Sequence, residues 1–306
     1  IRDCFATAPW RAGVPVVCAG NVTVGGGGKT PTAIAIAERL GARGRKPHFL
    51  TRGYGGRLSG PSRVEPDRHG AADVGDEALL LAARAPTWMG ADRAATARLA
   101  IAAGADVLVM DDGLQNNTLA RDLGLLVVDG GFGLGNGRLL PAGPLREPLT
   151  RAVRRVGAVV IIGDDETDLR QQLSGELSAD IPVLAAVVEP DAAAELAGVR
   201  VLAFAGIARP EKFFATLAAI GADIAERVEF ADHHRYAAAE IAELTRRAAG
   251  LGARLVTTEK DWVRLDADTR ANVAQLPIRL RWQDDAALDA LIDGLLDGHI
   301  GGGDAG

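Results

Sequence analysis

The sequence predicts an α/β protein with a P-loop NTPase-like, mostly parallel sheet flanked by helices, and a second, smaller α/β domain. Short apolar segments alternate with segments of helical period along most of the chain. The first apolar segment, 15–20, is followed by a run of glycines, a Lys-Thr pair and a helical segment. Strand, glycine turn, Lys-Thr and helix is the order found in loops that bind nucleoside triphosphates.

The first series of elements is expected to form a nucleotide-binding core domain over residues 1–190. Its strands are expected at 15–20, 47–51, 86–89, 106–110, 125–128, 156–162 and 183–188. Its helices are expected at 32–43, 77–85, 93–103 and 166–178. Because the strands are apolar along most of their length, helices should cover both faces of the sheet.

A second series predicts a C-terminal α/β domain over residues 191–306. Its strands are expected at 199–204, 228–230, 254–257 and 278–282, and its helices at 210–219 and 237–250. The Glu-Pro-Asp break at 189–191 marks the expected boundary. The glycine-rich tail from about residue 300 is expected to be disordered.

Composition excludes several classes of protein. A net charge of -6 argues against binding to nucleic acid, which needs positive charge. Two cysteines, Cys4 and Cys18, are too few for a disulfide scaffold and fit a reducing compartment. No apolar run approaches the ~18 residues of a membrane-spanning helix. The chain opens at Ile1 rather than Met, so a segment is expected upstream of it.

The loop after the first strand predicts a triphosphate site. Its glycines let the backbone fold tightly, so that successive N–H groups point at the phosphates. Lys29 is expected to reach the β- and γ-phosphates, and Thr30 to ligate Mg²⁺. Thr23 stands where the strict pattern has its first glycine. The residues expected to bind nucleotide are Thr23, Gly25, Gly26, Gly27, Gly28, Lys29 and Thr30.

Two carboxylates follow the apolar strand expected at 106–110. Asp111 and Asp112 lie where a P-loop protein keeps the acidic residue that organises Mg²⁺, and Glu77 is a further candidate ligand. A solvated Asp-Gly turn is the alternative, but the phosphate loop makes it the weaker one. The sequence therefore predicts that the loop binds a nucleoside triphosphate together with Mg²⁺.

Asp76 has two explanations that sequence alone does not separate: a helix cap and a catalytic carboxylate. His233 and His234 follow the strand expected at 228–230. Adjacent side chains point in different directions, and two ligands fall short of a zinc site. One histidine that accepts or orients a proton is as well supported as a surface turn.

Two other classes of function remain open at this point. A nucleotide-switch protein would hydrolyse nucleotide without an acceptor, although 257–261 does not match a guanine-specifying motif. An ATP-dependent synthetase that forms amides is the second class, but it does not explain the proline-rich loop at 139–148. The glycine cluster at 130–137 lacks the spacing of a dinucleotide-binding turn.

Together these segments resemble the tetraacyldisaccharide 4′-kinases of lipid A biosynthesis. The matching motifs, in chain order, are 20–31, 52–56, 74–77, 111–115, 135–148, 206–210, 230–234 and 258–261. The resemblance spans roughly residues 13–265, and the motifs are collectively highly specific. The chain departs from the family pattern at Gly27, usually Thr or Ser, and at Asn116, usually His. The family's apolar N-terminal helix is not found before Arg11.

The resemblance implies a kinase that uses ATP and Mg²⁺ to phosphorylate the 4′-hydroxyl of an acylated glucosamine disaccharide 1-phosphate, giving lipid IVA. It implies two α/β/α domains with the active site between them. It also implies a peripheral protein at the cytoplasmic face of the bacterial inner membrane. The oligomeric state is left open.

The resemblance also assigns roles to residues. The catalytic Asp–His pair falls on Asp76 and His233, with Lys29 as a third catalytic residue. Asp76 is expected to accept the sugar hydroxyl proton, and His233, preferred over His234, to orient it or share its charge. Apart from the resemblance, Arg52, Arg93 and Arg146 are candidates to contact phosphate or the sugar 1-phosphate, because guanidinium groups bind such anions, and surface solubility is an equally good explanation for each. Gln115, within the 111–115 motif, is a further candidate to contact the acceptor.

Overall fold

The computed structural model describes residues 8–191 and 193–300. Its strands are β1 (Val16–Gly20), β2 (Pro47–Thr51), β3 (Ser62–Arg63), β4 (Thr87–Met89), β5 (Val107–Asp111), β6 (Leu123–Asp129), β7 (Ala158–Ile162), β8 (Val183–Pro190), β9 (Arg200–Ala205), β10 (Asp223–Glu229), β11 (Arg254–Thr258), β12 (Ala274–Leu276) and β13 (Ile278–Trp282). Its helices are α1 (Lys29–Ala42), α2 (Ala71–Val74), α3 (Asp76–Ala82), α4 (Arg93–Ala102), α5 (Leu149–Val153), α6 (Leu169–Ser174), α7 (Ala193–Leu196), α8 (Pro210–Ala219), α9 (Ala238–Gly250), α10 (Glu259–Trp262), α11 (Ala267–Arg270) and α12 (Asp285–Ile300).

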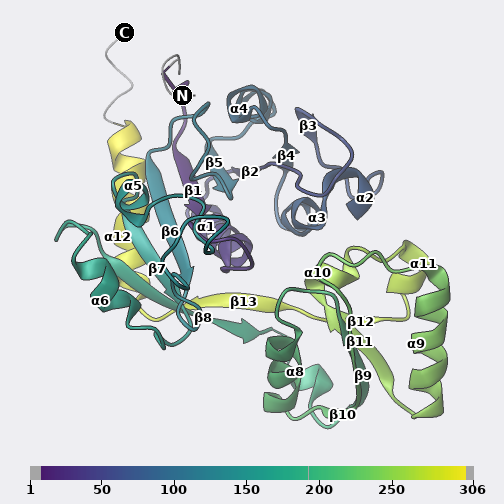
Figure 1. The fold of residues 1–306 in the computed structure, drawn as a ribbon. Coiled ribbons are helices and arrows are strands. Elements are labelled where there is room, and N and C mark those ends of the chain that lie inside the picture. The colour runs from purple at the N-terminus through teal and green to yellow at the C-terminus, as the bar shows by residue number, and fades with distance from the viewer. Residues whose placement is uncertain (1–7, 192, 301–306) are drawn as a thin grey trace.

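The strands form two sheets that lie beside each other (Figure 1). The larger sheet has nine strands in the order β13-β8-β7-β6-β1-β5-β2-β4-β3, and the smaller has four in the order β10-β9-β11-β12. Only β13 and β3, at the two edges of the larger sheet, pair antiparallel with their neighbours. The predicted fold class, a mostly parallel sheet with a smaller α/β unit, is confirmed.

Helices cover both faces of the larger sheet, as its apolar strands require. Along β1, Val16 and Cys18 face a core that includes side chains of α4, α5 and α6. Val17 and Ala19, on the alternate face, pack with α1 and α12. The smaller sheet repeats this arrangement, with α8 against one face of β9 and α9 against the other.

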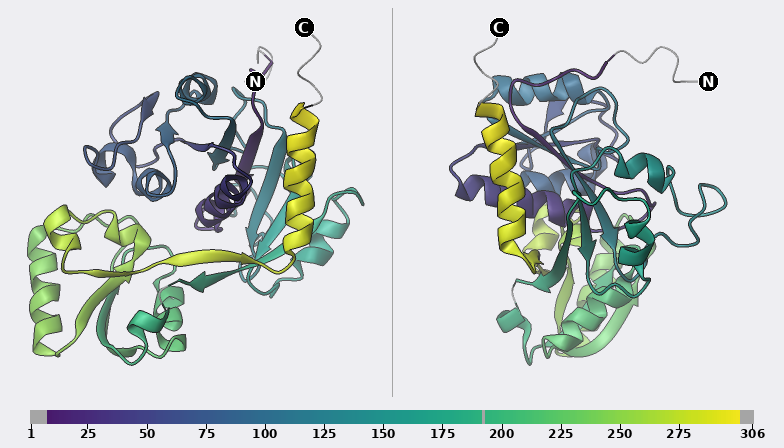
Figure 2. Two further views of the ribbon diagram at one scale, coloured as in Figure 1. Left: turned by 180° about the vertical axis from the view of Figure 1, so that it is seen from behind. Right: turned by 90° about the vertical axis from the view of Figure 1, so that its left-hand side faces the viewer.

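The strand expected at 278–282 does not lie in the smaller sheet as predicted. It is β13, which pairs with β8, so that Ile278 lies opposite Pro190 and Trp282 opposite Ala186. Two tertiary contacts place this strand in the larger sheet. β13 pairs with the edge of β8 that would otherwise be unpaired, and the apolar face of α12, which follows β13, is buried beside α1. Figure 2 shows β8 and β13 side by side where the chain crosses between the sheets.

We propose to divide the chain into a larger unit, residues 8–191 and 278–300, and a smaller unit, residues 193–276. In this division the C-terminal segment belongs with the phosphate loop rather than with the second series of elements. The tail predicted to be disordered lies, from residue 301 onward, outside the described residues.

The two units meet at the carboxyl ends of their central parallel strands, where α/β proteins bind ligands. The ends of β1, β5 and β6 belong to the larger unit, and the end of β11 leads into α10 of the smaller unit. Val263, which follows α10, packs with Val74 and Leu79 of the larger unit. An apolar contact therefore joins the units beside the site.

Candidate active site

The phosphate loop connects β1 to α1, and α1 begins at Lys29. Gly28 precedes the helix in a left-handed conformation with φ 81°. A Cβ atom at this position would lie 2.2 Å from Ile162 Cδ1, so only glycine fits. Gly28 has no side chain to cap the helix, which leaves the first N–H groups of α1 free to bind an anion.

Lys29 and Thr30 point from the first turn of α1 toward the carboxylates at the end of β5. Lys29 Nζ lies 3.5 Å from the Gly25 carbonyl oxygen and 3.8 Å from Asp112 Oδ2. The Thr30 hydroxyl donates to Asp111 Oδ2 at 2.9 Å. The structure thus brings together the Lys-Thr pair and the strand-end carboxylates that the sequence singles out.

Asp111 is 1% exposed, and its Oδ1 atom is buried with no hydrogen-bond partner. Burial, reinforced by the negative charges of Glu77 and Asp112, raises the pKa of Asp111 to about 7. An unpaired, buried carboxylate oxygen is costly unless a cation approaches it. Together with the Thr30 hydroxyl, this oxygen fits the all-oxygen coordination that Mg²⁺ prefers.

The other two predicted metal ligands are paired with basic side chains. Asp112 Oδ1 and Oδ2 accept hydrogen bonds from Arg146 Nη1 at 3.0 and 2.9 Å. Glu77 Oε1 lies 3.5 Å from Lys260 Nζ. Within residues 8–191 and 193–300, no three His, Cys, Asp or Glu side chains form a group that could hold a metal ion. A metal here would need ligands from a phosphate or from water.

Asp76 lies at the first position of α3 and is 5% exposed. Its Oδ1 atom accepts the N–H of the next residue, Glu77, at 2.9 Å. Its Oδ2 atom lies 3.1 Å from His233 Nδ1 and accepts Arg264 Nε at 2.9 Å. The helix-cap explanation is therefore wrong, because Gly75 precedes α3 as its N-cap, whereas the catalytic role of Asp76 stays a prediction.

Opposing effects set the pKa of Asp76. Burial alone would raise it. The positive charges of Lys260 and Arg264, the hydrogen bond from Arg264 and the neighbouring His233 outweigh burial, and hold the pKa of Asp76 below its usual range. All of these groups belong to the smaller unit, so the pKa of Asp76 depends on the contact between the units.

The two adjacent histidines face different partners. His233 adopts a left-handed φ of 59°, and its ring lies edge-on to Tyr54 with 6.1 Å between the centroids. His234 Nε2 instead lies 3.0 Å from Glu240 Oε2 of its own unit. Only His233 reaches Asp76.

The predicted acceptor residues differ in their surroundings. Arg52 is exposed. Arg93 is buried at 2%, donates from Nη1 to the Gly90 carbonyl, and keeps a buried Nε without a partner. Burial lowers the pKa of Arg93 to about 10. Gln115 Nε2 donates to the Asn21 carbonyl at 2.9 Å, which ties it to the base of the phosphate loop.

Three basic residues of the site were not singled out by the sequence. Arg209 Nη2 reaches across from the smaller unit to Asp129 Oδ2 at 3.1 Å and to the Gly26 carbonyl of the phosphate loop at 3.4 Å. Lys260 and Arg264 approach Asp76 from α10 and from the turn after it. Arg209 and Lys260 lie inside matched motifs, whereas Arg264 lies beyond one and has no local signal.

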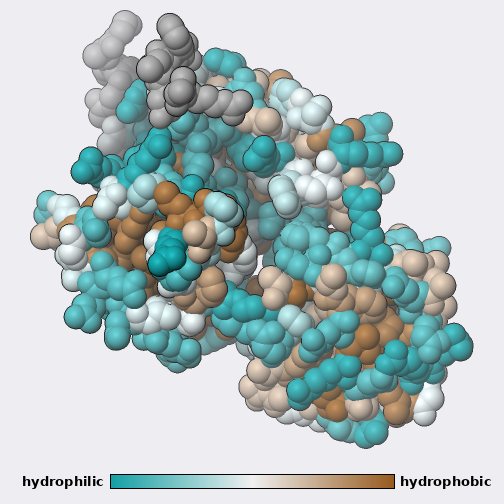
Figure 3. Space-filling view, viewed as in Figure 1, coloured by the Kyte–Doolittle hydropathy of each residue, from teal (hydrophilic) through white to brown (hydrophobic). Residues whose placement is uncertain are grey.

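Apolar side chains are exposed next to the phosphate loop. Leu139 and Leu140 are 45% and 53% exposed, and Val24 and Phe132 are also exposed. Nearby is a pocket of about 440 Å³ lined by Leu134, Gly137, Leu139, Leu145, Pro148, Leu149, Thr150, Gln172 and Glu176. Figure 3 shows hydrophobic residues gathered on the face of the larger unit that carries α5. None of the helices in the described part of the chain is long and apolar enough to span a membrane.

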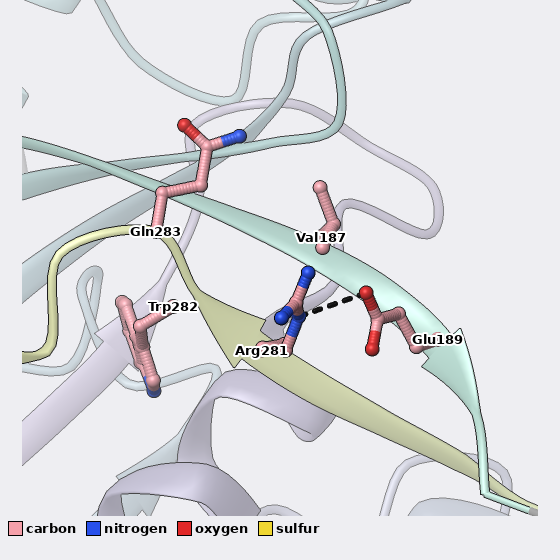
Figure 4. Close-up of a pocket in the computed structure, with 5 residues that line it drawn as sticks. All are labelled: Val187, Glu189, Arg281, Trp282 and Gln283. Atoms are coloured by element: carbon pink, nitrogen blue, oxygen red, sulfur yellow. Dashed lines mark hydrogen bonds and ion pairs between the residues drawn. The ribbon is translucent and has the colours of Figure 1, made fainter.

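A second pocket, of about 500 Å³, lies on β8 and β13 (Figure 4). Its lining residues are Val187, Glu189, Arg281, Trp282 and Gln283. Arg281 Nε donates to Glu189 Oε1 at 2.8 Å across the two strands. None of the predicted site residues lines this pocket, so it is separate from the candidate active site.

The Thr30 hydroxyl of the phosphate loop donates a hydrogen bond to the buried carboxylate of Asp111, and an Asp–His pair joins the two units. These features define the class of P-loop phosphotransferases. A family model described as tetraacyldisaccharide-1-P 4′-kinase matches residues 2–297. The chain belongs to this family, and the membership predicted from its motifs is confirmed.

Relatives from several bacteria support this membership. Tetraacyldisaccharide 4′-kinase of Rhodospirillum centenum is 53% identical over 290 residues, which cover 94% of this chain and 85% of the relative. The enzyme of the same name from Gluconacetobacter diazotrophicus is 54% identical over 279 residues, covering 91% and 84%. The crystal structure of LpxK from Aquifex aeolicus in complex with ATP superposes with a TM-score of 0.74 at 26% identity, covering 95% of this chain and 91% of that one.

Proposed function

We propose that this protein transfers the γ-phosphate of ATP to the 4′-hydroxyl of a tetraacylated glucosamine disaccharide 1-phosphate, giving lipid IVA. One observation is the main support for the proposal. His233 Nδ1 lies 3.1 Å from Asp76 Oδ2, at the same edge of the larger sheet as the phosphate loop. Membership of the 4′-kinase family supports the choice of acceptor.

Lys29 and the backbone N–H groups of residues 25–30 would hold the β- and γ-phosphates. Thr30 and Asp111 would hold Mg²⁺, which supplies positive charge to the phosphoryl oxygens when it is bound. The unpaired Oδ1 atom of Asp111 supports this assignment, because a cation would relieve its buried charge. Asp112 and Glu77 lie near enough to raise the pKa of Asp111, and they would surround the metal site without binding the ion directly.

Asp76 would orient the 4′-hydroxyl and accept its proton as the new P–O bond forms. A carboxylate with a lowered pKa is fully ionised at neutral pH but is a weak base. This suits phosphoryl transfer, whose loose transition state demands positioning more than early deprotonation. His233 would share the proton or stabilise the charge of Asp76.

Arg52 and Arg146 would contact phosphate groups, since guanidinium donors match phosphate geometry. Arg52 is exposed, which suits the 1-phosphate of an incoming acceptor. The buried Arg93 would act at a distance, by placing its charge near Asp111 and Asp112. Gln115 would support the base of the phosphate loop through Asn21.

We further propose that the acyl chains and the membrane surface meet the apolar loops beside the phosphate loop. Backbone hydrogen bonds from Val24 to Pro144 at 2.9 Å and from Arg146 to Val22 at 2.7 Å tie the 138–148 loop to the phosphate loop. An acyl chain bound among Leu139, Leu145 and Leu149 would therefore lie near the triphosphate. This would place the protein peripherally at the cytoplasmic face of the inner membrane.

The test is a phosphorylation assay with γ-labelled ATP, Mg²⁺ and detergent-dispersed tetraacyldisaccharide 1-phosphate. Label is expected at the 4′ position, and ADP release should depend on the acceptor. Equal ADP release with and without the acceptor would instead identify a nucleotide hydrolase.

A further inference from the structure

Arg264 lies in the turn after α10, and its side chain is 5% exposed. Its Nε atom donates to Asp76 Oδ2 at 2.9 Å, and its Nη2 atom donates to the same oxygen. Its Nη1 atom donates to the Gly206 carbonyl at 2.7 Å and to Asp261 Oδ1 at 2.7 Å. All three nitrogens of the guanidinium are therefore engaged, one edge toward the larger unit and the other toward the smaller.

The Gly206 carbonyl connects Arg264 to His233. This carbonyl also accepts the His233 N–H at 3.1 Å. His233 has a left-handed backbone, which persists only where the surroundings hold it. One guanidinium thus holds the carboxylate of Asp76 and the peptide group that fixes the backbone of His233.

Asp261 anchors Arg264 from the other side. It is fully buried, and its Oδ1 atom also accepts the Tyr236 hydroxyl at 2.8 Å and the Gly206 N–H at 3.1 Å. Its Oδ2 atom accepts the Thr258 hydroxyl at 2.7 Å. A buried ion pair is stable only when its remaining hydrogen-bonding groups are satisfied, and here they are. The position of Arg264 is therefore tightly determined.

We propose that Arg264 is the positioning residue for both members of the Asp76–His233 pair, aligning them across the contact between the two units. The inference rests on the proposed kinase function and deepens it. Arg264 does not need to touch either substrate. It fixes the distance between Asp76 and His233.

Two substitutions separate geometry from charge. Arg264→Lys keeps the charge but not the planar fork, so it cannot bridge Asp76 and Gly206. We expect kcat to fall about 100-fold, the effect of a roughly 1 Å misplacement, with the KM for ATP unchanged. Arg264→Gln also removes a positive charge that lowers the pKa of Asp76. The acid limb of the kcat/KM profile should therefore move to higher pH, because Asp76 must be ionised to act.

Chemical rescue distinguishes positioning from a general structural role. In Arg264→Ala, dilute guanidinium ion should restore part of the lost activity by occupying the vacated position. Arg270→Ala is the matched control. Arg270 donates to the Trp262 carbonyl at 3.2 Å and lies over the Trp262 ring in the same segment, without contacting the Asp–His pair. Guanidinium should not stimulate this variant.

A further measurement is independent of turnover. The carboxyl ¹³C shift of Asp76, followed by NMR during a pH titration, should report a higher pKa in Arg264→Gln than in the wild type. Folded Arg264 variants with wild-type kcat, or with an unshifted titration and no rescue, would overturn the inference. A wild-type protein that fails to phosphorylate the disaccharide would count against the proposed function, whereas the titration would still test Arg264.

Discussion

His233 Nδ1 lies 3.1 Å from Asp76 Oδ2, although 157 positions separate the two residues in the chain. The first belongs to the smaller unit and the second to the larger. Because the pair forms only when the units are in contact, the proposed transfer of the hydroxyl proton to Asp76 requires this arrangement. The same contact supplies Lys260 and Arg264, whose positive charges outweigh burial and lower the pKa of Asp76.

Asp76→Asn should lower turnover by about 10²–10⁴-fold, the usual contribution of a positioned acid or base. The amide keeps the size of the side chain but cannot accept the hydroxyl proton. The affinity for ATP should stay near that of the wild type, because Asp76 lies outside the phosphate loop. Asp73→Asn, a change to an acidic residue of the preceding helix, is the control, and steady-state kinetics provide the measurement. Wild-type turnover in Asp76→Asn would refute the assignment.

Lys29→Ala should weaken the binding of MgATP by about 10–100-fold, since hydrogen bonds to charged groups contribute about 1.5–3 kcal/mol. Titration calorimetry on the folded variant measures this directly. Lys46→Ala, at an exposed position beyond α1, is the control for loss of a lysine. If Lys29→Ala bound MgATP like the wild type, the phosphate-loop assignment would be wrong.

Asp111→Asn should stabilise the protein above pH 7 when no metal is present. In the folded state the pKa of Asp111 is raised to about 7, so ionising it at higher pH costs folding free energy. The gain in Tm should shrink as the pH falls through 7 toward the ordinary range of an aspartate, where the native side chain is neutral. Calorimetry at several pH values measures the difference. A gain independent of pH would show that the carboxylate charge is not its cause.

Mg²⁺ should raise the Tm of the wild type at pH 8 but not that of Asp111→Asn, because a ligand stabilises only the state that binds it. The experiment needs MgATP as well as Mg²⁺ alone, since phosphate oxygens complete the coordination. Equal stabilisation of both proteins would remove Asp111 from the metal site.

The double substitution Leu139→Asp/Leu140→Asp should reduce binding to anionic phospholipid vesicles and raise the KM for the acylated acceptor. Two exposed leucines beside the phosphate loop would be replaced by charges that the bilayer interior disfavours. Sedimentation with vesicles and kinetics against a deacylated disaccharide measure the two effects. Leu251→Asp, at an exposed leucine of the smaller unit, is the control. Equal vesicle binding by both variants would refute the proposed membrane face.

Local patterns were sufficient to predict most of the fold. The glycine run and the apolar strand before it located the phosphate loop, because phosphate binding demands a short contiguous motif. The strands expected at 47–51 and 254–257 correspond to β2 and β11. The short β3 and β12 were missed, since two or three residues carry no measurable period.

Features that depend on tertiary contacts could not be predicted. Nothing within 278–282 shows that this segment pairs with β8, because the partner lies about ninety positions away and the deciding burial comes from α12. Arg93 resembles any exposed basic residue at the start of a helix, yet it is buried. Arg264 is one of many arginines in the sequence, and only the fold places it against Asp76.

The crossing of β8 and β13 makes the smaller unit an insertion within the larger one. On the ribosome, β8 is complete long before β13 and α12 emerge, so one edge of the larger sheet and the apolar surface beside α1 stay uncovered during synthesis. The inserted unit can fold in that interval, because both of its sheet faces are covered by its own helices. β13 and α12 then cover the open edge and the apolar surface of the larger unit, so its completion waits until residues 278–300 have been translated.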